Sequence, residues 1–392
     1  MTPTKRVAIL WTLVLALFGL FSAVYWAAMV MVAPAEEPEG HPVTAYGLIG
    51  AGAFVITLVL VPLCRRLAGG LGVVDQPDQD RKIHGQSVPY LGGLAFYAAF
   101  LAALAYLAVA HPEYNRELFY PMALIGTIIV MMGIYDDVRD MRNTIKLTVE
   151  LALIAILYLW GFRTAEIANP FTDGTLYVGW LALFITPIWI AGVMNAINFS
   201  DGLDGLAAGL VFVCAASVFA IGIMHKQVIS CLIMAYLMGT TLAFLRYNFH
   251  PASIFMGDTG ALFLGFVLGT TTLFVRQKGV AAIALSVPVV VMAVPILDTV
   301  LSMWRRMRRA GIGGFFLADR DHLHHRLLNL GLSQPKVVLS LYYISMCMGL
   351  MAFIFSVTPP PYNFLIHVLA LLFIIFGIVV LKFVEGRSAD KE

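Results

Sequence analysis

The feature that most constrains this chain is its succession of apolar runs, each about as long as a lipid bilayer is thick. About 20 apolar residues form a helix that crosses the hydrocarbon core, and 60% of the chain is hydrophobic while only 12% is charged. A mean hydropathy of +0.87 argues against a water-soluble globule. We therefore predict an all-α polytopic integral membrane protein with about 11–12 transmembrane helices. The predicted spans are residues 7–32, 44–64, 89–110, 118–135, 145–162, 177–197, 205–224, 228–246, 260–275, 280–303, 337–357 and 362–381.

Composition also limits the domain organisation and the partners. We treat residues 1–392 as a single transmembrane domain, because no repeat and no soluble domain stands out. A formal net charge of +2 gives no support for a nucleic-acid partner. The four cysteines lie inside apolar runs without paired or metal-ligand spacing, so no disulfide framework is implied.

The distribution of lysine and arginine predicts which loops face the cytoplasm. Basic residues gather in cytoplasmic loops, and placing Lys5 and Arg6 on that side fixes every later loop by alternation. Every polar motif described below falls on this cytoplasmic face, although none of these motifs was used to choose the orientation of the chain in the membrane. The same side receives all 25 lysine and arginine residues except Arg116, Arg163, Lys226, Arg276 and Lys278.

Three acidic motifs lie at the predicted cytoplasmic ends of spans. Asp136, Asp137 and Asp140 form the run DDVRD, in which adjacent carboxylates repel one another unless a cation or a shared proton offsets the charge. NFSDGLDG joins two spans with almost no connector, and RYNFHPASIFMGDTG leads into another. Magnesium suits such oxygen-rich sites, especially with phosphate in its coordination shell, whereas helix capping explains one aspartate more easily than all of them. The candidate side chains of the second and third motifs are Asn198, Asp201, Asp204, Asn248, Phe255 and Asp258.

Two further loops carry basic and imidazole side chains that suit phosphate. The loop RKIHGQSVPYLGG offers Lys82 and His84, although a purely topological role explains its positive charge equally well. Within the longest cytoplasmic loop, 304–336, the run DRDHLHHRL holds a cluster that suits a sugar phosphate or a pyrophosphate. A zinc site and a merely basic surface loop stay open as alternatives, but no cysteine lies nearby. The members of the cluster are His322, His324, His325 and Arg326.

Two acidic residues, Glu150 and Asp298, lie inside predicted spans. Ionisable groups within a bilayer are functional candidates, but both residues are shallow enough to reach water. Each of the two residues could therefore contact the substrates directly or support the residues that do, and the sequence favours neither role.

The motifs RKIH…PYLGG, DDVRD, NFSDGLDGLAAG, NFHPASIFMGDTG and HLHHR, in this order, resemble the polyprenyl-phosphate N-acetylhexosamine-1-phosphate transferases over residues 44–330. The resemblance implies an enzyme that requires Mg²⁺, or Mn²⁺ in its place. Such enzymes transfer a sugar 1-phosphate from a UDP-sugar donor to a membrane polyprenyl phosphate and release UMP. HLHHR resembles the branch that uses UDP-N-acetylglucosamine and undecaprenyl phosphate for O-antigen, common-antigen or teichoic-acid synthesis. In members of the branch that uses the UDP-muramoyl-pentapeptide donor, the sequence at the position of HLHHR is different and contains more histidines.

The resemblance also implies roles for individual residues. Asp258, Asp136 and Asp137 are expected to be catalytic, and Asp258, Asp137 and Asp201 to hold the metal. Phe255 would stack on the uracil of the donor. A bacterial inner-membrane location, an active site that faces the cytoplasm and a homodimer are expected on the same basis. The other expected substrate-binding residues are Lys82, His84, Asn198, Asp201, Asp204, Asn248, His322, His324, His325 and Arg326.

The chemistry and its rivals can be ordered from the same motifs. The acceptor phosphate is mostly dianionic at neutral pH, so we expect direct in-line attack, with a covalent route through an aspartate as the competing mechanism. Another UDP-sugar, such as UDP-N-acetylgalactosamine or UDP-N-acetylmuramoyl-pentapeptide, is the alternative donor. Functions of other classes are an ion-coupled transporter, whose site usually lies near the midplane, and an intramembrane prenyltransferase, because DDVRD also fits an aspartate-rich prenyl-diphosphate motif.

Overall fold

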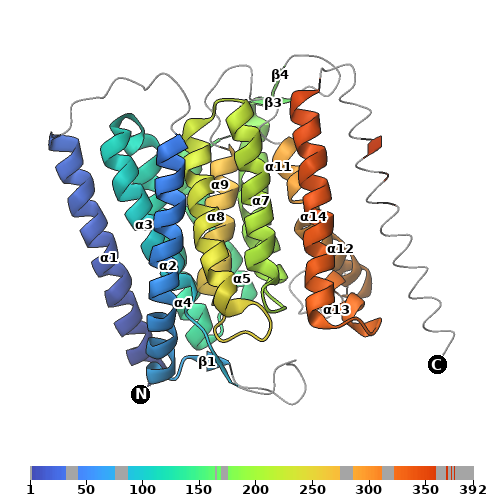
Figure 1. Ribbon diagram of the computed structural model, residues 1–392, viewed down its shortest axis with the longest axis horizontal. Helices are drawn as coiled ribbons and strands as arrows, with labels where there is room; N and C mark the ends of the chain where they lie inside the picture. The colour runs from blue at the N-terminus through green and yellow to red at the C-terminus, as the bar shows by residue number, and fades with distance from the viewer. Residues whose placement is uncertain are drawn as a thin grey trace.

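The computed structural model shows a bundle of long, roughly parallel and antiparallel helices (Figure 1). It describes residues 2–31, 43–75, 87–163, 166–168, 175–273, 286–310 and 322–358, with isolated positions 368, 369, 372 and 375. The predicted fold class, an all-α polytopic membrane protein, is confirmed, because seven of the described helices are long and apolar enough to cross a membrane. The last predicted span, 362–381, lies almost wholly outside the described residues.

The helices follow the predicted order of spans. Short elements connect them: strands β1 (Val74–Asp75), β2 (Val88–Pro89), β3 (Glu166–Ala168) and β4 (Thr175–Tyr177) form two antiparallel hairpins. The helices are α1 (Pro3–Met31), α2 (Val43–Leu71), α3 (Gly93–Ala110), α4 (Tyr120–Arg139), α5 (Asn143–Leu159), α6 (Ala182–Ser200), α7 (Leu206–Met224), α8 (Val228–Asn248), α9 (Gly257–Leu273), α11 (Ser286–Val291), α12 (Ala293–Ala310), α13 (Leu323–Asn329) and α14 (Gln334–Val357).

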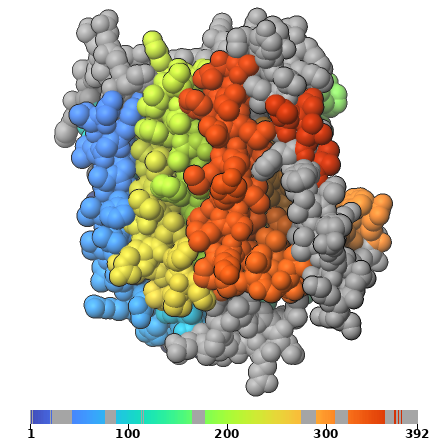
Figure 2. All heavy atoms as spheres, turned by 45° about the vertical axis from the view of Figure 1, so that its right-hand side comes forward, coloured from blue at the N-terminus to red at the C-terminus, as the bar shows by residue number. Residues whose placement is uncertain are grey.

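The predicted span 280–303 is not one continuous helix. Its described part divides at Met292 into α11 and α12, and α12 continues to Ala310. Pro295 explains the break, because proline has no N–H to continue an earlier helix but fits the first turn of a new one. In Figure 2 part of this segment is visible as an orange patch at the right-hand edge of the molecule, beyond the orange-red atoms of α14.

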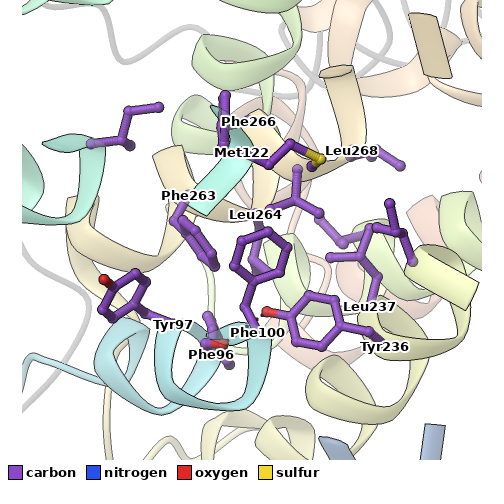
Figure 3. Close-up of a cluster of buried hydrophobic side chains, with 14 of the residues drawn as sticks. Phe96, Tyr97, Phe100, Met122, Tyr236, Leu237, Phe263, Leu264, Phe266 and Leu268 are labelled. Atoms are coloured by element: carbon purple, nitrogen blue, oxygen red, sulfur yellow. Dashed lines mark hydrogen bonds between the residues drawn. The ribbon is translucent and has the colours of Figure 1, made fainter. Parts of the chain in front are cut away.

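Helix α9 forms the centre of the bundle. All its described residues except Asp258 are buried, as expected of a helix that is surrounded by other helices. Phe263 packs edge-on against Tyr97 and Phe100 of α3, with ring centroids 5.8 and 5.2 Å apart (Figure 3). A Cβ atom built at Gly133 of α4 would lie 2.4 Å from the Thr259 Cα, so only glycine permits this approach. The C-terminal end of α4 therefore meets the N-terminal end of α9.

The two hairpins mark the two ends of the bundle. In Figure 1, β3 and β4 lie at the upper end, whereas β1 and α13 lie at the lower end together with the chain's N-terminus. We call the lower end the α13 end. It also holds the turn between α6 and α7 and the start of α9, because Phe255 donates its N–H to Pro89 of β2 (2.9 Å). The described motifs of the sequence therefore meet at one end of the bundle.

Candidate active site

Asp137 of α4 joins the DDVRD and FMGDTG motifs. Its Oδ1 accepts the Asp258 N–H (2.8 Å), and its Oδ2 accepts the Thr259 N–H (3.2 Å) and hydroxyl (2.6 Å). These are the free donors at the start of α9, so Asp137 caps that helix from a neighbouring one. Gly257 has φ +67°, and a Cβ there would lie 2.5 Å from the Asp137 carboxylate. The glycine before Asp258 is therefore required for the cap.

A lysine lies between two of the predicted carboxylates. Lys146 Nζ is 2.8 Å from Asp136 Oδ2 and also contacts Asp258 Oδ2, while Asn198 donates its amide N–H to Asp258 Oδ1 (2.6 Å). Sequence reasoning counted Lys146 only as a topological charge and missed its place in the site. Its position at the shallow end of a predicted span was the available signal, because charged residues at membrane depth are usually functional. One positive charge thus holds two carboxylates together.

Asp201 faces this cluster from the turn between α6 and α7. Burial and the negative charges of Asp258, Asp137 and Asp204 raise the pKa of the Asp201 carboxyl well above its ordinary value. Among the described residues, no side chain or backbone N–H donates a hydrogen bond to this carboxylate. A cation beside Asp201 and Asp258 would relieve this repulsion.

The fit to a magnesium ion follows from which oxygens are committed. In the described part of the chain, no group of three histidine, cysteine or acidic side chains forms a ready metal site. Magnesium usually binds through one or two carboxylates and completes its shell with water and substrate phosphate. Asp201 and Asp258 meet that requirement. Asn198 and Lys146 occupy two of the roughly four acceptor positions of Asp258, whereas three of those of Asp137 are already occupied. The donor set therefore fits Mg²⁺ bound together with a phosphate ligand.

Asp204 and Asn248 hold the loops of the site together. Asp204 Oδ2 accepts the Ala252 N–H (3.1 Å) and pairs with His250 Nδ1 (2.8 Å). The Asn248 side chain accepts the Gly205 N–H and donates to the Ile254 carbonyl, both at 3.0 Å. Both side chains are buried, so they fasten the NFHPAS segment to the DGLDG turn behind Asp201.

An aromatic pair borders the carboxylates. Phe255 and Tyr90 have ring centroids 6.0 Å apart, and both are half-buried. Burial, together with the negative charges of Asp137, Asp201 and Asp258, raises the pKa of the Tyr90 hydroxyl. Tyr90 was not among the sequence candidates. Two of the sequence candidates, Lys82 and His84, lie outside the described residues.

The histidine motif packs against the NFSDGLDG turn. His322 and His324 are buried with nearly parallel rings 5.6 Å apart, and His325 lies 4.4 Å from His324. Burial and the neighbouring His325 and His322 lower the pKa of His324 to about 3, so this imidazole is neutral. A Cβ at Gly202 would lie 2.6 Å from His324 Nε2. Arg326 follows in the same short helix and is half-buried.

A cavity of about 810 Å³ opens beside the cluster, between α5, α6, α11 and α12. Apolar residues such as Leu151, Ile188 and Val300 line most of it. Lys146 links the cavity to the carboxylates, since it lines the one and contacts the others. The other polar residues that line the cavity are Asn143, Asn195, Asn198, Thr299, Arg306 and His322.

The fold and the site define a polytopic membrane protein with an acidic cluster and a buried lysine at one end of the bundle, and with an apolar cavity beside them that extends along α6. The family model described as Glycosyl transferase family 4 matches residues 119–276, which include α4 to α9. A Bacillus subtilis protein described as a "probable undecaprenyl-phosphate N-acetylglucosaminyl 1-phosphate transferase" is 34% identical over 78% of this chain and 83% of its own length.

Two other relatives show the breadth of the family. A decaprenyl-phosphate N-acetylglucosaminephosphotransferase of Mycobacterium leprae is 34% identical over 81% of this chain and 85% of its own length. A phospho-N-acetylmuramoyl-pentapeptide-transferase of Listeria monocytogenes is 29% identical over 78% and 95%. The chain belongs to the family of polyprenyl-phosphate N-acetylhexosamine-1-phosphate transferases. It is a multi-pass membrane phosphosugar transferase.

Proposed function

We propose that this protein transfers N-acetylglucosamine 1-phosphate from UDP-N-acetylglucosamine to undecaprenyl phosphate, and that it releases UMP. The observation that carries the proposal is the direct connection between the carboxylate–lysine cluster and a long apolar cavity, through Lys146. A reaction between a soluble anionic donor and a lipid acceptor needs both features at one point. The names of the relatives with the higher identities support this donor over the muramoyl-pentapeptide donor.

The cavity suits the lipid acceptor. Its apolar wall accommodates an isoprenoid chain, since burial of apolar surface stabilises binding by about 25 cal/mol per Å². Its polar end presents Lys146 and Arg306, both cationic, and the amide of Asn198. A phosphate at the head of the lipid would meet these groups. The tail then lies between α5, α6 and α12, and the phosphate lies next to the acidic cluster.

The chain's own residues account for much of the chemistry at phosphorus. Lys146 neutralises negative charge where the acceptor phosphate approaches, and Asn198 and Lys146 fix the rotamer of Asp258. Asp258 and Asp201, with Asp137 beside them, would hold a magnesium ion, or manganese in its place. When bound, this ion supplies charge neutralisation on the pyrophosphate and on the departing UMP. Asp136 would position the acceptor or take its residual proton, and attack is direct and in line.

The donor would occupy the other side of the cluster. Phe255 and Tyr90 offer aromatic faces for the uracil ring, beside Asp201. His325 and Arg326 would contact the pyrophosphate and the sugar, whereas the neutral, buried His324 acts through its packing against the His322 and His325 rings. We place the protein in the bacterial inner membrane with the α13 end in the cytoplasm, where UDP-sugars are made, and the lysine and arginine distribution supports this orientation.

The test is UMP release by the purified protein in detergent with UDP-N-acetylglucosamine, undecaprenyl phosphate and Mg²⁺. We expect release that depends on the lipid, stops with a chelator, and is absent from Asp258→Ala protein of normal thermal stability. Release only with UDP-N-acetylgalactosamine or the muramoyl-pentapeptide donor would change the proposed substrate but keep the reaction. Folded protein that releases no UMP from any donor would overturn the proposal.

A further inference from the structure

Asp298, an acidic residue on α12, makes contacts that extend the site beyond its sequence motifs. The carboxylate is 9% exposed. Its Oδ1 accepts the Leu323 N–H at the start of α13 (2.6 Å), and its Oδ2 lies 3.1 Å from His322 Nδ1. His324 Nδ1 lies further away, at 4.0 Å. Asp298 therefore both caps α13 and binds the first histidine of the motif.

These contacts determine where His322 carries its proton. A carboxylate can only accept a hydrogen bond, so Nδ1 of His322 is the protonated nitrogen. Nε2 is then an acceptor, and it lies 3.4 Å from the Arg306 Nη2, which can only donate. The polarity of every group in the series from Asp298 to Arg306 is therefore consistent with one tautomer.

Arg306 connects this series to the acceptor cavity. Its guanidinium carbon lies 5.6 Å from the centre of the Phe199 ring, within the range of a cation–π contact. The side chain is 9% exposed and lines the polar end of the cavity with Lys146 and His322. Arginine binds phosphate through a planar, directional group, so its orientation affects its affinity.

We propose that Asp298 is a positioning residue for the lipid acceptor. It holds His322 in the Nδ1–H tautomer, and His322 Nε2 in turn holds Arg306 in the orientation that binds the acceptor phosphate. The inference rests on the proposed function, because it assigns the cavity to the lipid. A carboxylate that orients an imidazole in this way acts through the tautomer rather than through its own contact with substrate.

Asp298→Asn separates this role from helix capping. The asparagine oxygen can still accept the Leu323 N–H, so the cap is retained. The amide NH₂ now faces His322 Nδ1, which must become an acceptor, and the proton moves to Nε2. Two donors, Nε2–H and the Arg306 guanidinium, then face each other. Asp298→Ala, in contrast, removes the cap and the tautomer control together.

The first experiment measures UMP release while each substrate is varied separately. For Asp298→Asn we expect about a tenfold higher KM for undecaprenyl phosphate, with the KM for the UDP-sugar within about twofold of wild type. In Arg306→Gln protein, adding Asp298→Asn should not raise the KM for undecaprenyl phosphate further, because both substitutions act through the contact between His322 and Arg306. An unchanged lipid KM, equal increases in both KM values, or additive effects would overturn the inference.

A second readout does not depend on activity. In ¹⁵N-histidine-labelled protein in detergent, NMR reports which ring nitrogen carries the proton, and a His322→Gln sample identifies the signal. We expect Nδ1–H in wild type and Nε2–H in Asp298→Asn, and the same tautomer in both would overturn the inference. Wild-type protein that releases no UMP would instead count against the proposed function. Active wild type with an unaltered Asp298→Asn lipid KM counts against this inference alone.

Discussion

Two helix starts at the α13 end use the same device for different purposes. At α9, Asp137 of another helix accepts the N–H groups of Asp258 and Thr259. At α13, Asp298 of another helix accepts the N–H of Leu323. In each case a carboxylate from a neighbouring helix fixes where the next motif begins. The caps are alike, but the side chains that they hold in place are opposite in character.

The difference lies in the surrounding charge. Around α9, Asp136 and Asp258 share Lys146, and Asp201 adds a further carboxylate, which leaves negative charge in excess. Around α13, Asp298 lies 3.1 Å from His322 Nδ1 and 4.0 Å from His324 Nδ1, and Arg306 contacts Nε2 of the His322 ring. The first region favours a cation, whereas Arg306 of the second, which we call the basic region, offers hydrogen-bond donors to an anion such as a phosphate. A substrate that brings both, such as a pyrophosphate with its divalent ion, matches the pair of regions better than either alone.

The largest expected effect comes from the carboxylate at the centre of the acidic region. Asp258→Asn keeps the size of the side chain but removes its charge. We expect kcat/KM for UMP release to fall at least about 1,000-fold, which corresponds to about 4 kcal/mol of transition-state stabilisation. Asp140→Asn, an exposed carboxylate of the same DDVRD run, is the matched control and should stay within about twofold. If kcat/KM fell equally in Asp258→Asn and Asp140→Asn, the activity would depend on the total charge of the motifs and not on the position of Asp258.

The lysine in the acidic region comes next. Lys146→Met removes the positive charge but keeps most of the chain length, so Asp136 and Asp258 face each other without compensation. Breaking a buried ion pair costs about 3 kcal/mol or more. We expect lower thermal stability and about a 100-fold lower kcat/KM. The exposed Lys336→Met serves as control. Wild-type stability and activity in Lys146→Met would show that the carboxylates do not need this charge.

The basic region should respond to acid through His324. Its folded-state pKa of about 3 lies below the ordinary value of 6.5, so the unfolded chain binds a proton more readily. The stability that His324 contributes is therefore complete above pH 6.5 and declines as the pH falls towards 3. Between pH 7 and pH 5 the loss is about 2 kcal/mol. We expect detergent-denaturation midpoints of His324→Gln to vary less over this range, and parallel curves would contradict the assignment.

The sequence could predict which residues share the α13 end, because alternation of spans places every motif on one face. It could also indicate Asp136 and Asp137, since adjacent carboxylates at a span end need compensation. It could not show that Asp137 caps α9 or that Lys146 compensates Asp258, because both contacts join residues more than 100 positions apart. Hydropathy gives the helices but not which ones are neighbours.

The same reason explains the place of Asp298. The run 280–303 is apolar enough to span a membrane as one helix, and although Pro295 accounts for the break near Met292, only packing shows that the second segment brings Asp298 to His322. Asp204 and Asn248 were expected to bind the nucleotide or support the metal. Their buried contacts with the loop backbone depend on how two loops meet, which no local pattern records.

The smallest expected effect tests whether the two regions are coupled. Gly202 lies beside Asp201 in the acidic region and touches His324 of the basic region. In Gly202→Ala the new methyl group would displace a buried ring that stacks on His322. We expect the free energy of unfolding to fall by about 1 kcal/mol.

A double-mutant cycle makes that test specific. In a His324→Ala background the methyl group has space, so Gly202→Ala should cost almost nothing there, and the difference between the two costs measures the coupling. Gly52→Ala in α2, where a Cβ would meet no atom within 4 Å, is the control for replacing a glycine. If Gly202→Ala costs the same with and without the His324 ring, the acidic and basic regions do not communicate through this contact.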